Sequence, residues 1–336
     1  MRRLLIYLLI FVIYFPILAG EYAASFLDIG VGARALGMGG AFCSIADDES
    51  AFYWNPAGLG FVDRIHISGM YGPQFGTLRN PLGHFHFMGY IQPLRGKAVA
   101  SFNWIRLSVD DIAIYPELQG DSKWDRLHNP SLRPTGNPDG YMRDTEDALF
   151  FSFAVLNQFE LDLGWKYNPL PIDIPLGINI KAIRQSLGDY GSSGIGLDFG
   201  MMVRFHMDTF LESPWWGILS FGIQFQDVTG THISWNTDYQ DFLPSNTKWG
   251  LSYRQPLKKL NGELNVSFDK DSRWRGRKRW GLEFSGFQVF ALRVGIDHGQ
   301  FTCGVGLRFW IMNVNYAILT HEMDSIHRIS CSISIK

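Results

Sequence analysis

Large apolar side chains alternate with polar or small ones through most of the chain. From Ile195 to Phe205 every second residue is large and apolar, and the residues between them are Gly, Asp, Met or Arg. The last such segment, from Arg328 to Ile335, alternates Ile and Cys with Arg and Ser. A helix would repeat about every 3.6 residues, so a period of two predicts strands with one apolar face.

About fourteen such segments follow one another from residue 64 to the C-terminus, an even number that suits a closed bacterial barrel. Many reach about ten residues, whereas strands of soluble proteins average five or six. We predict strands at 64–72, 83–93, 98–107, 147–167, 173–187, 193–206, 215–227, 245–255, 262–270, 278–286, 288–298, 301–309, 313–320 and 327–335.

Alternation alone also fits a soluble sandwich with one wet face, and two further patterns favour a membrane barrel. Connections at one end are short, as at 95–97, 286–287 and 310–312, whereas the other end has the long polar stretches 108–146 and 228–244. Short inner turns and long outer loops are typical of outer-membrane barrels. Aromatic residues would gather at the two rims, as membrane interfaces favour: Trp165, Tyr167, Trp215, Trp216 and Trp310 at the inner rim, with Trp235, Trp274 and Trp280 at the outer rim.

The first twenty residues have the pattern of a secretory signal peptide. Met1–Arg3 is basic, residues 4–18 are apolar, and the small residues Ala19 and Gly20 follow. About 15 apolar residues are short for a membrane-spanning helix, which needs roughly 20. We therefore expect residues 1–20 to be cleaved during export, and we place residues 63–336 in the outer membrane as an all-β, transmembrane antiparallel barrel.

Residues 21–62 lack the alternation and predict a small hatch, or plug, in the barrel. Asp47 or Asp48 can cap a short helix over residues 50–54, and Asn55 with Pro56 predicts a second helix start that Gly58 would end. The run from Gly30 to Ala35 matches a dinucleotide fingerprint only on paper, because glycines at 37, 39 and 40 prevent the sustained helix that this fingerprint requires.

The glycine-rich run, the acidic pair and the Trp-Asn-Pro-Ala-Gly-Leu ending of residues 30–59 closely resemble the N-terminus of the PorV/PorQ family. This family is part of the wider FadL-like superfamily. The resemblance implies a 14-stranded barrel whose N-terminal hatch fills the lumen. The hatch motif consists of Gly37, Gly39, Gly40, Asp47, Asp48, Asn55, Pro56, Ala57 and Gly58. This chain departs from the usual pattern at its end, which is Ile335-Lys336 and not an aromatic residue.

The resemblance implies either of two functions. FadL-like barrels take up long-chain fatty acids or other hydrophobic molecules and release them through a kink in the third strand. Here a change of phase near Trp104, Ile105 and Arg106 predicts a β-bulge and a lateral gap, although a strand that simply ends at the membrane edge explains it as well. PorV acts as a partner in protein secretion, which would make the long outer loops a docking surface for exported cargo.

The inward face and the longest loop bear on the same choice. Charged residues of both signs would point inward and pair with each other or with the hatch: Lys181, Asp198, Arg204, Glu263, Asp269, Glu283, Arg293 and Arg308. The longest loop could hold an apolar ligand or cargo site at Ile112, Ile114, Tyr115 and Leu118.

We expect neither catalysis nor a cofactor. His84 and His86 share one strand face, but the sequence offers them no third metal ligand, and no nucleophile–base arrangement is recognisable. A net charge of −2 argues against nucleic acid as a partner. The expected partners are outer-membrane lipid, a hydrophobic ligand such as a long-chain fatty acid, and secreted-protein cargo in the alternative function.

Overall fold

A computed structural model describes residues 23–77, 79–132, 136–162, 164, 168–213, 215–273, 277–320 and 325–335. The predicted signal peptide, residues 1–20, lies outside these ranges, as do Trp165, Tyr167 and Trp274. Among the described residues, no helix is both long and apolar enough to cross a membrane.

Strands dominate the described part of the chain. They are β1 (Ile65–Thr77), β2 (Asn80–Pro93), β3 (Ala98–Ile114), β4 (Gly140–Leu161), β5 (Leu170–Leu187), β6 (Tyr190–His206), β7 (Ile218–Gln226), β8 (Thr231–Trp235), β9 (Gln240–Leu243), β10 (Asn246–Leu257), β11 (Gly262–Asp271), β12 (Lys278–Gly286), β13 (Phe290–Asp297), β14 (Gln300–Phe309), β15 (Met312–Thr320) and β16 (Ser325–Ile335). All pairings among them are antiparallel.

The strands form a closed barrel, as the alternation predicts. Of the 16 strands of the sheet, all but β8 and β9 follow one another around a ring, which the pairing of β5 with β6 closes. The ring therefore has 14 strands, and the predicted all-β barrel is confirmed. The hairpin β8–β9 was not predicted, because its residues lie in a stretch that we interpreted as loop. It pairs with the start of β6, beyond the end of β7.

Helices are short. Four lie in the N-terminal part: η1 (Ser25–Asp28), α2 (Ala33–Gly37), α3 (Ala51–Trp54) and η2 (Pro56–Phe61). The others lie in connections between strands: η3 (Arg95–Lys97), α4 (Lys123–His128), η4 (Pro130–Leu132), α5 (Met207–Phe210) and η5 (Lys258–Leu260).

The connections differ in part from the prediction. We call the end of the barrel with the β2–β3 turn and the C-terminus the inner end. The connections 188–189 and 298–299 at the outer end contain only two residues each, so the predicted length difference between the ends is wrong there. Gly188, His298 and Gly299 have positive φ values of 56°, 48° and 88°, which suit the tight turns of hairpins.

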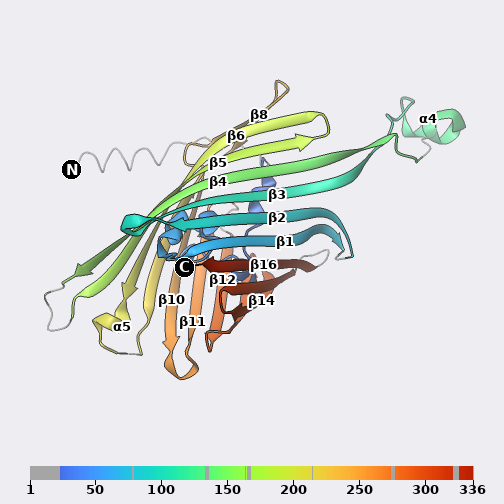
Figure 1. Ribbon diagram of the computed structural model, residues 1–336. Coiled ribbons are helices and arrows are strands. Elements are labelled where there is room, and N and C mark those ends of the chain that lie inside the picture. The colour runs from blue at the N-terminus through green and yellow to red at the C-terminus, as the bar shows by residue number, and fades with distance from the viewer. Residues whose placement is uncertain are drawn as a thin grey trace.

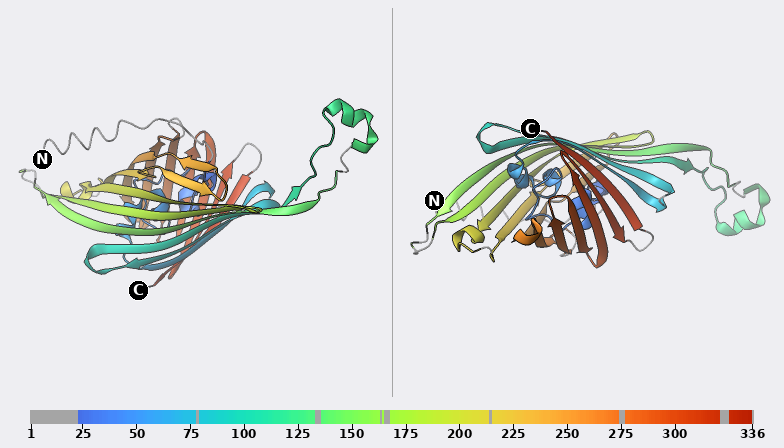
Figure 2. Two further views of the ribbon diagram at one scale, coloured as in Figure 1. Left: turned by 90° about the horizontal axis from the view of Figure 1, so that it is seen from above. Right: turned by 60° about the horizontal axis from the view of Figure 1, so that its bottom comes forward.

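The two strands β3 and β4 extend well past their predicted limits at the outer end. Together with the connection that contains α4 they form a projection, the β3–β4 arm (residues 108–146), which Figures 1 and 2 show reaching far beyond the neighbouring strands. Trp215 and Trp310, at the inner end, expose 86% and 94% of their surface. Trp235 and Trp280 lie near the outer ends of β8 and β12.

The two faces of the barrel wall differ in polarity. On β6, Leu197 is 44% exposed on the outer face, whereas its neighbour Asp198 is 4% exposed and faces the lumen. On β5, Ile180 and Lys181 show the same contrast, with 48% and 3% exposed. Outward apolar positions on neighbouring strands therefore form a continuous apolar surface, as a membrane-spanning barrel requires.

Candidate functional site

Residues 23–62, the N-terminal segment, lie inside the barrel. Helix α2 contacts β13 to β16, and η2 contacts β3 to β6 on the other side of the ring. Figures 1 and 2 show this segment, coloured blue, enclosed by the strands. Nearly all of its side chains between Val31 and Gly60 are buried, so it fills the cross-section of the lumen.

Inward-facing glycines of the wall receive the backbone of the N-terminal segment. A Cβ atom on Gly177 would lie 2.3 Å from the carbonyl carbon of Pro56, and one on Gly222 would lie 2.2 Å from the carbonyl oxygen of Cys43. Real Cβ atoms do not approach other atoms so closely, so any larger residue would displace the segment. The alternating glycines of the strands therefore have a structural role that the sequence pattern did not reveal.

The Asn-Pro-Ala element joins the N-terminal segment to the wall. The Asn55 amide Nδ2 donates to the carbonyl oxygens of Cys43 at 2.9 Å and Met201 at 3.2 Å, and its Oδ1 accepts from the Ala57 backbone N–H at 3.2 Å. Asn55 is fully buried, so these bonds satisfy a side chain that has no access to water.

Gly58 has a different role from the one predicted. Helix η2 continues past it to Phe61, so Gly58 does not end the helix. A Cβ atom on Gly58 would lie 1.9 Å from the Ala46 carbonyl oxygen. Glycine is therefore required here for close contact within the segment.

The three earlier glycines face different surroundings. A Cβ atom on Gly37 would lie 3.1 Å from Gly304 Cα of β14. Gly39 has φ +66°, and its Cβ would lie 2.8 Å from the Ile296 backbone nitrogen of β13. Gly40 has φ +70° and lies against Trp54. Gly37 and Gly39 therefore lie against the wall backbone, whereas Gly40 lies between Trp54 of the segment and the Arg279 side chain of β12.

Arg34 and the acidic pair link the segment to the wall at its inner side. Arg34 Nη1 contacts Asp47 at 2.7 Å and Asp48 at 3.2 Å, and its Nε and Nη2 donate to the two oxygens of Glu283 at 2.8 Å each. Asp47 also pairs with Arg254 of β10 at 2.5 Å. Burial alone raises the pKa of Asp47, but the guanidinium groups of Arg34 and Arg254 lower it well below its usual range.

The predicted cap of helix α3 by Asp47 or Asp48 is wrong, because the N-cap is Ser50, whose side chain does not bond the first turn; Asp48 instead stabilises the turn that precedes the helix. Its Oδ1 accepts hydrogen bonds from the Ser50 backbone N–H at 2.9 Å and from the Ser50 hydroxyl at 2.6 Å. The helix starts at Ala51, directly after Ser50. Asp48 thus stabilises the turn before α3, whereas Asp47 forms an ion pair with the wall.

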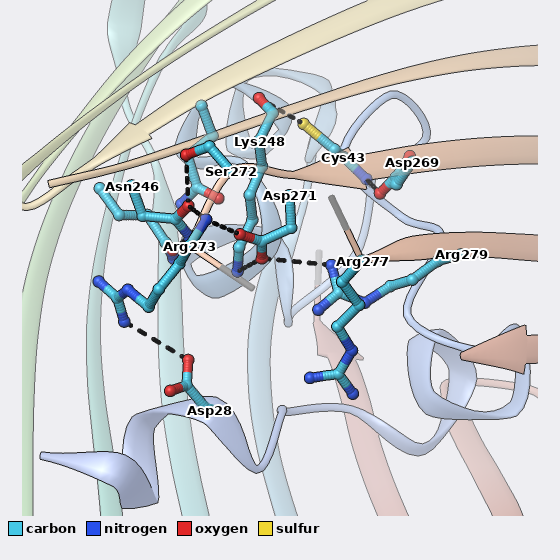
Figure 3. Close-up of polar contacts among 12 residues, drawn as sticks. Asp28, Cys43, Asn246, Lys248, Asp269, Asp271, Ser272, Arg273, Arg277 and Arg279 are labelled. Carbon is cyan, nitrogen blue, oxygen red and sulfur yellow. Dashed lines mark hydrogen bonds and ion pairs between the residues drawn. The ribbon is translucent and has the colours of Figure 1, made fainter. Parts of the chain in front are cut away.

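A second polar network lies on β10 to β12, as Figure 3 shows. Asp269 Oδ2 accepts from the backbone N–H groups of Phe42 and Cys43 at 2.7 Å each. Arg273, next to the end of β11, pairs with Asp28 of η1 at 3.5 Å. The sequence predicted that Asp269 would face inward, but its backbone partners and the Asp28–Arg273 pair were missed, because such partners lie more than 200 residues apart.

The predicted pairing of inward charges is confirmed for Lys181, Asp198, Arg204, Glu283 and Arg293, but not for Arg308, which is exposed and donates to the Asn313 side chain. Lys181 contacts Asp198 and Asp227 at 2.9 Å each, and Glu283 pairs with Arg293 at 2.7 Å. Arg204 lies 3.6 Å from Asp47. Most of these charges are buried, and each is compensated by a partner of opposite sign.

The opposite half of the lumen is apolar. Phe52 of α3 stacks on Phe87 of β2 with ring centroids 5.5 Å apart and meets the edge of Phe150 of β4 at 5.1 Å. Ile105 and Ile183 belong to the same buried cluster. The wall of β2 to β4, with Ile183 of β5, thus offers an apolar surface, which the N-terminal segment covers in this structure.

A polar cavity of about 560 Å³ lies under the N-terminal segment at the inner end. Arg34, Asp47 and Glu49 of the segment form its ceiling, and residues of the inner turns, such as Asn261 and Gln288, form its rim. Burial, with the charge of Asp48 nearby, raises the pKa of Glu49 to about 7.

The predicted bulge of the third strand is displaced. Trp104, Ile105 and Arg106 pair without interruption with β2 on one side and β4 on the other, so the hypothesis of a gap at these residues is wrong. The irregularity lies between Val109 and Ile112, where Asp111 has φ 56°. The change of phase has another origin: Trp104 and Arg106 face outward, whereas Ile105 is buried against the apolar cluster inside.

The residues predicted as a ligand or cargo site lie on the β3–β4 arm, away from the lumen. Ile114, Tyr115 and Leu118 expose 43%, 60% and 61% of their surface, and Ile112 is half-buried. His84 and His86 lie on the outer face of β2, where the Tyr71 hydroxyl bonds His84 at 2.9 Å. Within the described ranges, no group of three or more His, Cys, Asp or Glu side chains is arranged to hold a metal ion.

Comparison with known proteins gives a match in structure alone. No protein-family description matches the sequence, and no curated protein does so. The deltaS2S3 mutant of the TodX monoaromatic hydrocarbon channel superposes with a TM-score of 0.51 at 10% identity, covering 91% of this chain and 98% of that chain. The P. putida toluene transporter TodX gives 0.50 at 11% identity, covering 91% and 97%. At such identities the likeness shows a shared fold.

Proposed function

We propose that this chain is a FadL-like barrel of the bacterial outer membrane, of the PorV/PorQ family, and that it serves the passive uptake of hydrophobic molecules such as long-chain fatty acids. Residues 1–20 are the cleaved signal peptide, and residues 21–62 are a hatch. The observation that carries the proposal is a closed barrel with an apolar outer face whose lumen is filled by its own N-terminal segment. The likeness of its fold to a monoaromatic hydrocarbon channel supports the same substrate class.

The apolar half of the lumen is the natural route for such a molecule. Phe52 occupies it between Phe87 and Phe150, and a hydrophobic substrate could take the place of this ring at small cost in free energy. The opposite half is held by buried ion pairs, which a hydrophobic molecule cannot replace. The hatch would therefore give way on the side of β2 to β4.

Uptake by cells tests this function. In bacteria that lack their own channel for long-chain fatty acids, expression of this chain is expected to raise the initial uptake of labelled oleate or toluene several-fold. Phe52→Ala should raise it further, and the matched control Phe102→Ala, which removes a phenyl ring 52% exposed on the outer face, should leave it unchanged. Uptake equal to that of cells without the protein would contradict the proposal.

One observation favours a second function, that of a PorV-like partner in protein secretion. The β3–β4 arm carries exposed apolar side chains above the barrel, and Tyr115, Leu118 and Trp124 are 60%, 61% and 65% exposed. Clusters of this kind often bind other proteins. A secreted protein that co-purifies with the wild type, but not with the double variant Tyr115→Ser/Leu118→Ser, would support this function. Oleate uptake should then be absent.

A further inference from the structure

A row of polar side chains crosses the outer face of β1 to β5, where apolar residues are expected. Direct cross-strand pairs connect its members in the order Tyr71, His86, Arg106, Asp147 and Arg184, which together are called the polar row. Directly opposed residues of antiparallel strands have Cβ atoms roughly 5 Å apart, so these side chains are neighbours.

The polar row lies at the edge of the apolar surface. Two residues closer to the inner end, β2, β3 and β4 place Met88, Trp104 and Leu149 side by side on the outer face. Two residues further in the same direction, β2 to β5 place Tyr90, Phe102, Phe151 and Ile180 side by side. Exposure of 61% at Met88 and 56% at Phe151 shows that these side chains face the surroundings of the barrel. The polar row therefore marks the level at which lipid tails give way to head groups on this side.

A cleft of about 250 Å³ opens at this level. It is lined by His86, Trp104, Arg106, Ser108, Asp110, Arg143 and Thr145. Since its residues belong to three adjacent strands, its floor is rigid sheet. A preformed cleft of this size can take a head group of a lipid while the acyl chains lie on the apolar side chains below.

Asp147 fixes the orientation of Arg106. Its carboxylate accepts from Arg106 Nε at 2.7 Å and Nη2 at 2.8 Å, and from the Trp104 indole N–H at 2.8 Å. The guanidinium carbon lies 5.0 Å from the centre of the Trp104 ring, a cation–π contact. The two bonds to Asp147 use Arg106 Nε and Nη2. They hold the guanidinium in a fixed orientation and leave Nη1 to donate to a ligand.

The charges of the surface favour an anion. Arg106 and Arg143 each pair with one aspartate, Asp147 and Asp110, so Arg184 gives the surface an excess positive charge, and the His86 ring adds a hydrogen-bonding group. Guanidinium groups match the oxygens of phosphate, and basic residues at a membrane surface bind phosphorylated head groups.

We propose that the polar row and its cleft form a site for the phosphate of a membrane lipid, whose acyl chains cover Met88, Phe102 and Phe151. The inference requires that the barrel lies in a membrane, but it does not depend on what the barrel transports. The row acts as an anchor that binds lipid from outside the barrel, separate from the lumen and the N-terminal segment.

Native mass spectrometry of the whole mature protein, released from detergent micelles, tests this site. The probes are a phosphatidic acid and the diacylglycerol with the same acyl chains. Wild type is expected to retain one phosphatidic acid and to bind diacylglycerol at least about tenfold more weakly. Arg106→Gln/Arg184→Gln should lose this preference, Arg106→Lys should keep part of it, and Arg308→Gln, which alters an exposed arginine at the inner end, should not change it.

Four results would overturn the proposal. Equal retention of the two lipids by wild type would show that the head group is not recognised. Undiminished preference in the double variant would place the site elsewhere. Displacement of phosphatidic acid by inorganic phosphate at low millimolar concentration would mean that the site binds free anions. A protein dimer that carries no lipid would mean that a second copy of the chain covers this surface. Fatty-acid uptake is measured on the same double variant and should be normal.

Discussion

Arg34 of the N-terminal segment forms a two-pronged hydrogen-bonded ion pair with Glu283 of the barrel wall, with both distances at 2.8 Å. The two residues are 249 positions apart in the sequence. Glu283 is 4% exposed at its side chain, so its charge depends on Arg34 and Arg293 for compensation. This contact ties the contents of the lumen to the wall.

Arg34→Met should destabilise the protein, because it leaves the buried Glu283 carboxylate with one cationic partner in place of two. We expect the free energy of unfolding in detergent, measured with a chemical denaturant, to fall by about 3 kcal/mol. Arg64→Met provides the control, since that side chain is 52% exposed and its loss should change stability by less than about 0.5 kcal/mol. Equal effects of the two changes would argue against a structural role for the pair.

Gly177→Val should disturb the fit between the segment and β5. The added Cβ would come within 2.3 Å of the Pro56 carbonyl carbon, so the Asn-Pro-Ala element would have to move. We expect liposomes with this variant to admit small sugars in a swelling assay, whereas wild type excludes them. Gly191→Val is the matched control on β6, because its Cβ would meet nothing nearer than 3.8 Å.

Asn55→Ala should loosen the middle of the N-terminal segment. It removes the donor that reaches the carbonyl oxygens of Cys43 and Met201 and leaves these groups buried without that partner. The cost is about 1–3 kcal/mol. Hydrogen exchange read by mass spectrometry should show faster exchange in residues 42–57 and unchanged exchange in β12 and β13; uniform protection in both regions would refute the assigned role.

Glu49 makes stability depend on pH. Its pKa is raised from 4.5 to about 7 in the folded protein, so between these values the folded state binds more protons than the unfolded state. The free energy of unfolding should therefore fall as pH rises from 4.5 to 7, by an amount on the order of 1–3 kcal/mol. Glu49→Gln should remove this contribution and flatten the profile. Superimposable profiles of variant and wild type would show that Glu49 is not responsible.

The sequence predicted the barrel and the side of the wall on which residues lie. The alternation of apolar and polar residues can be recognised from neighbouring residues alone. It assigned Leu197 to the outer face and Asp198 to the lumen correctly. It also predicted the helix start at Asn55 and Pro56, because caps depend on residues two or three positions away.

Contacts across the lumen could not be predicted in this way. Nothing in the sequence around Gly177 indicates that Pro56 lies against it, and Arg34 gives no sign of Glu283, since these partners meet only when the barrel closes. The bulge was misplaced at Trp104 for a related reason. A change of phase can arise where the lumen becomes apolar, as it does beside Ile105, without any break in the pairing of the strand.

Residues 23–62 are proposed to fill the lumen of a membrane barrel, and the reactivity of Cys43 tests this most directly. Its side chain is buried between the segment and the wall, with 1% exposed. In protein with Cys303→Ser and Cys331→Ser, reconstituted in lipid vesicles, a water-soluble thiol reagent should label Cys43 at least about a hundredfold more slowly than in the denatured chain. Labelling as fast as in the denatured chain would show that the segment lies outside the barrel and would contradict the account.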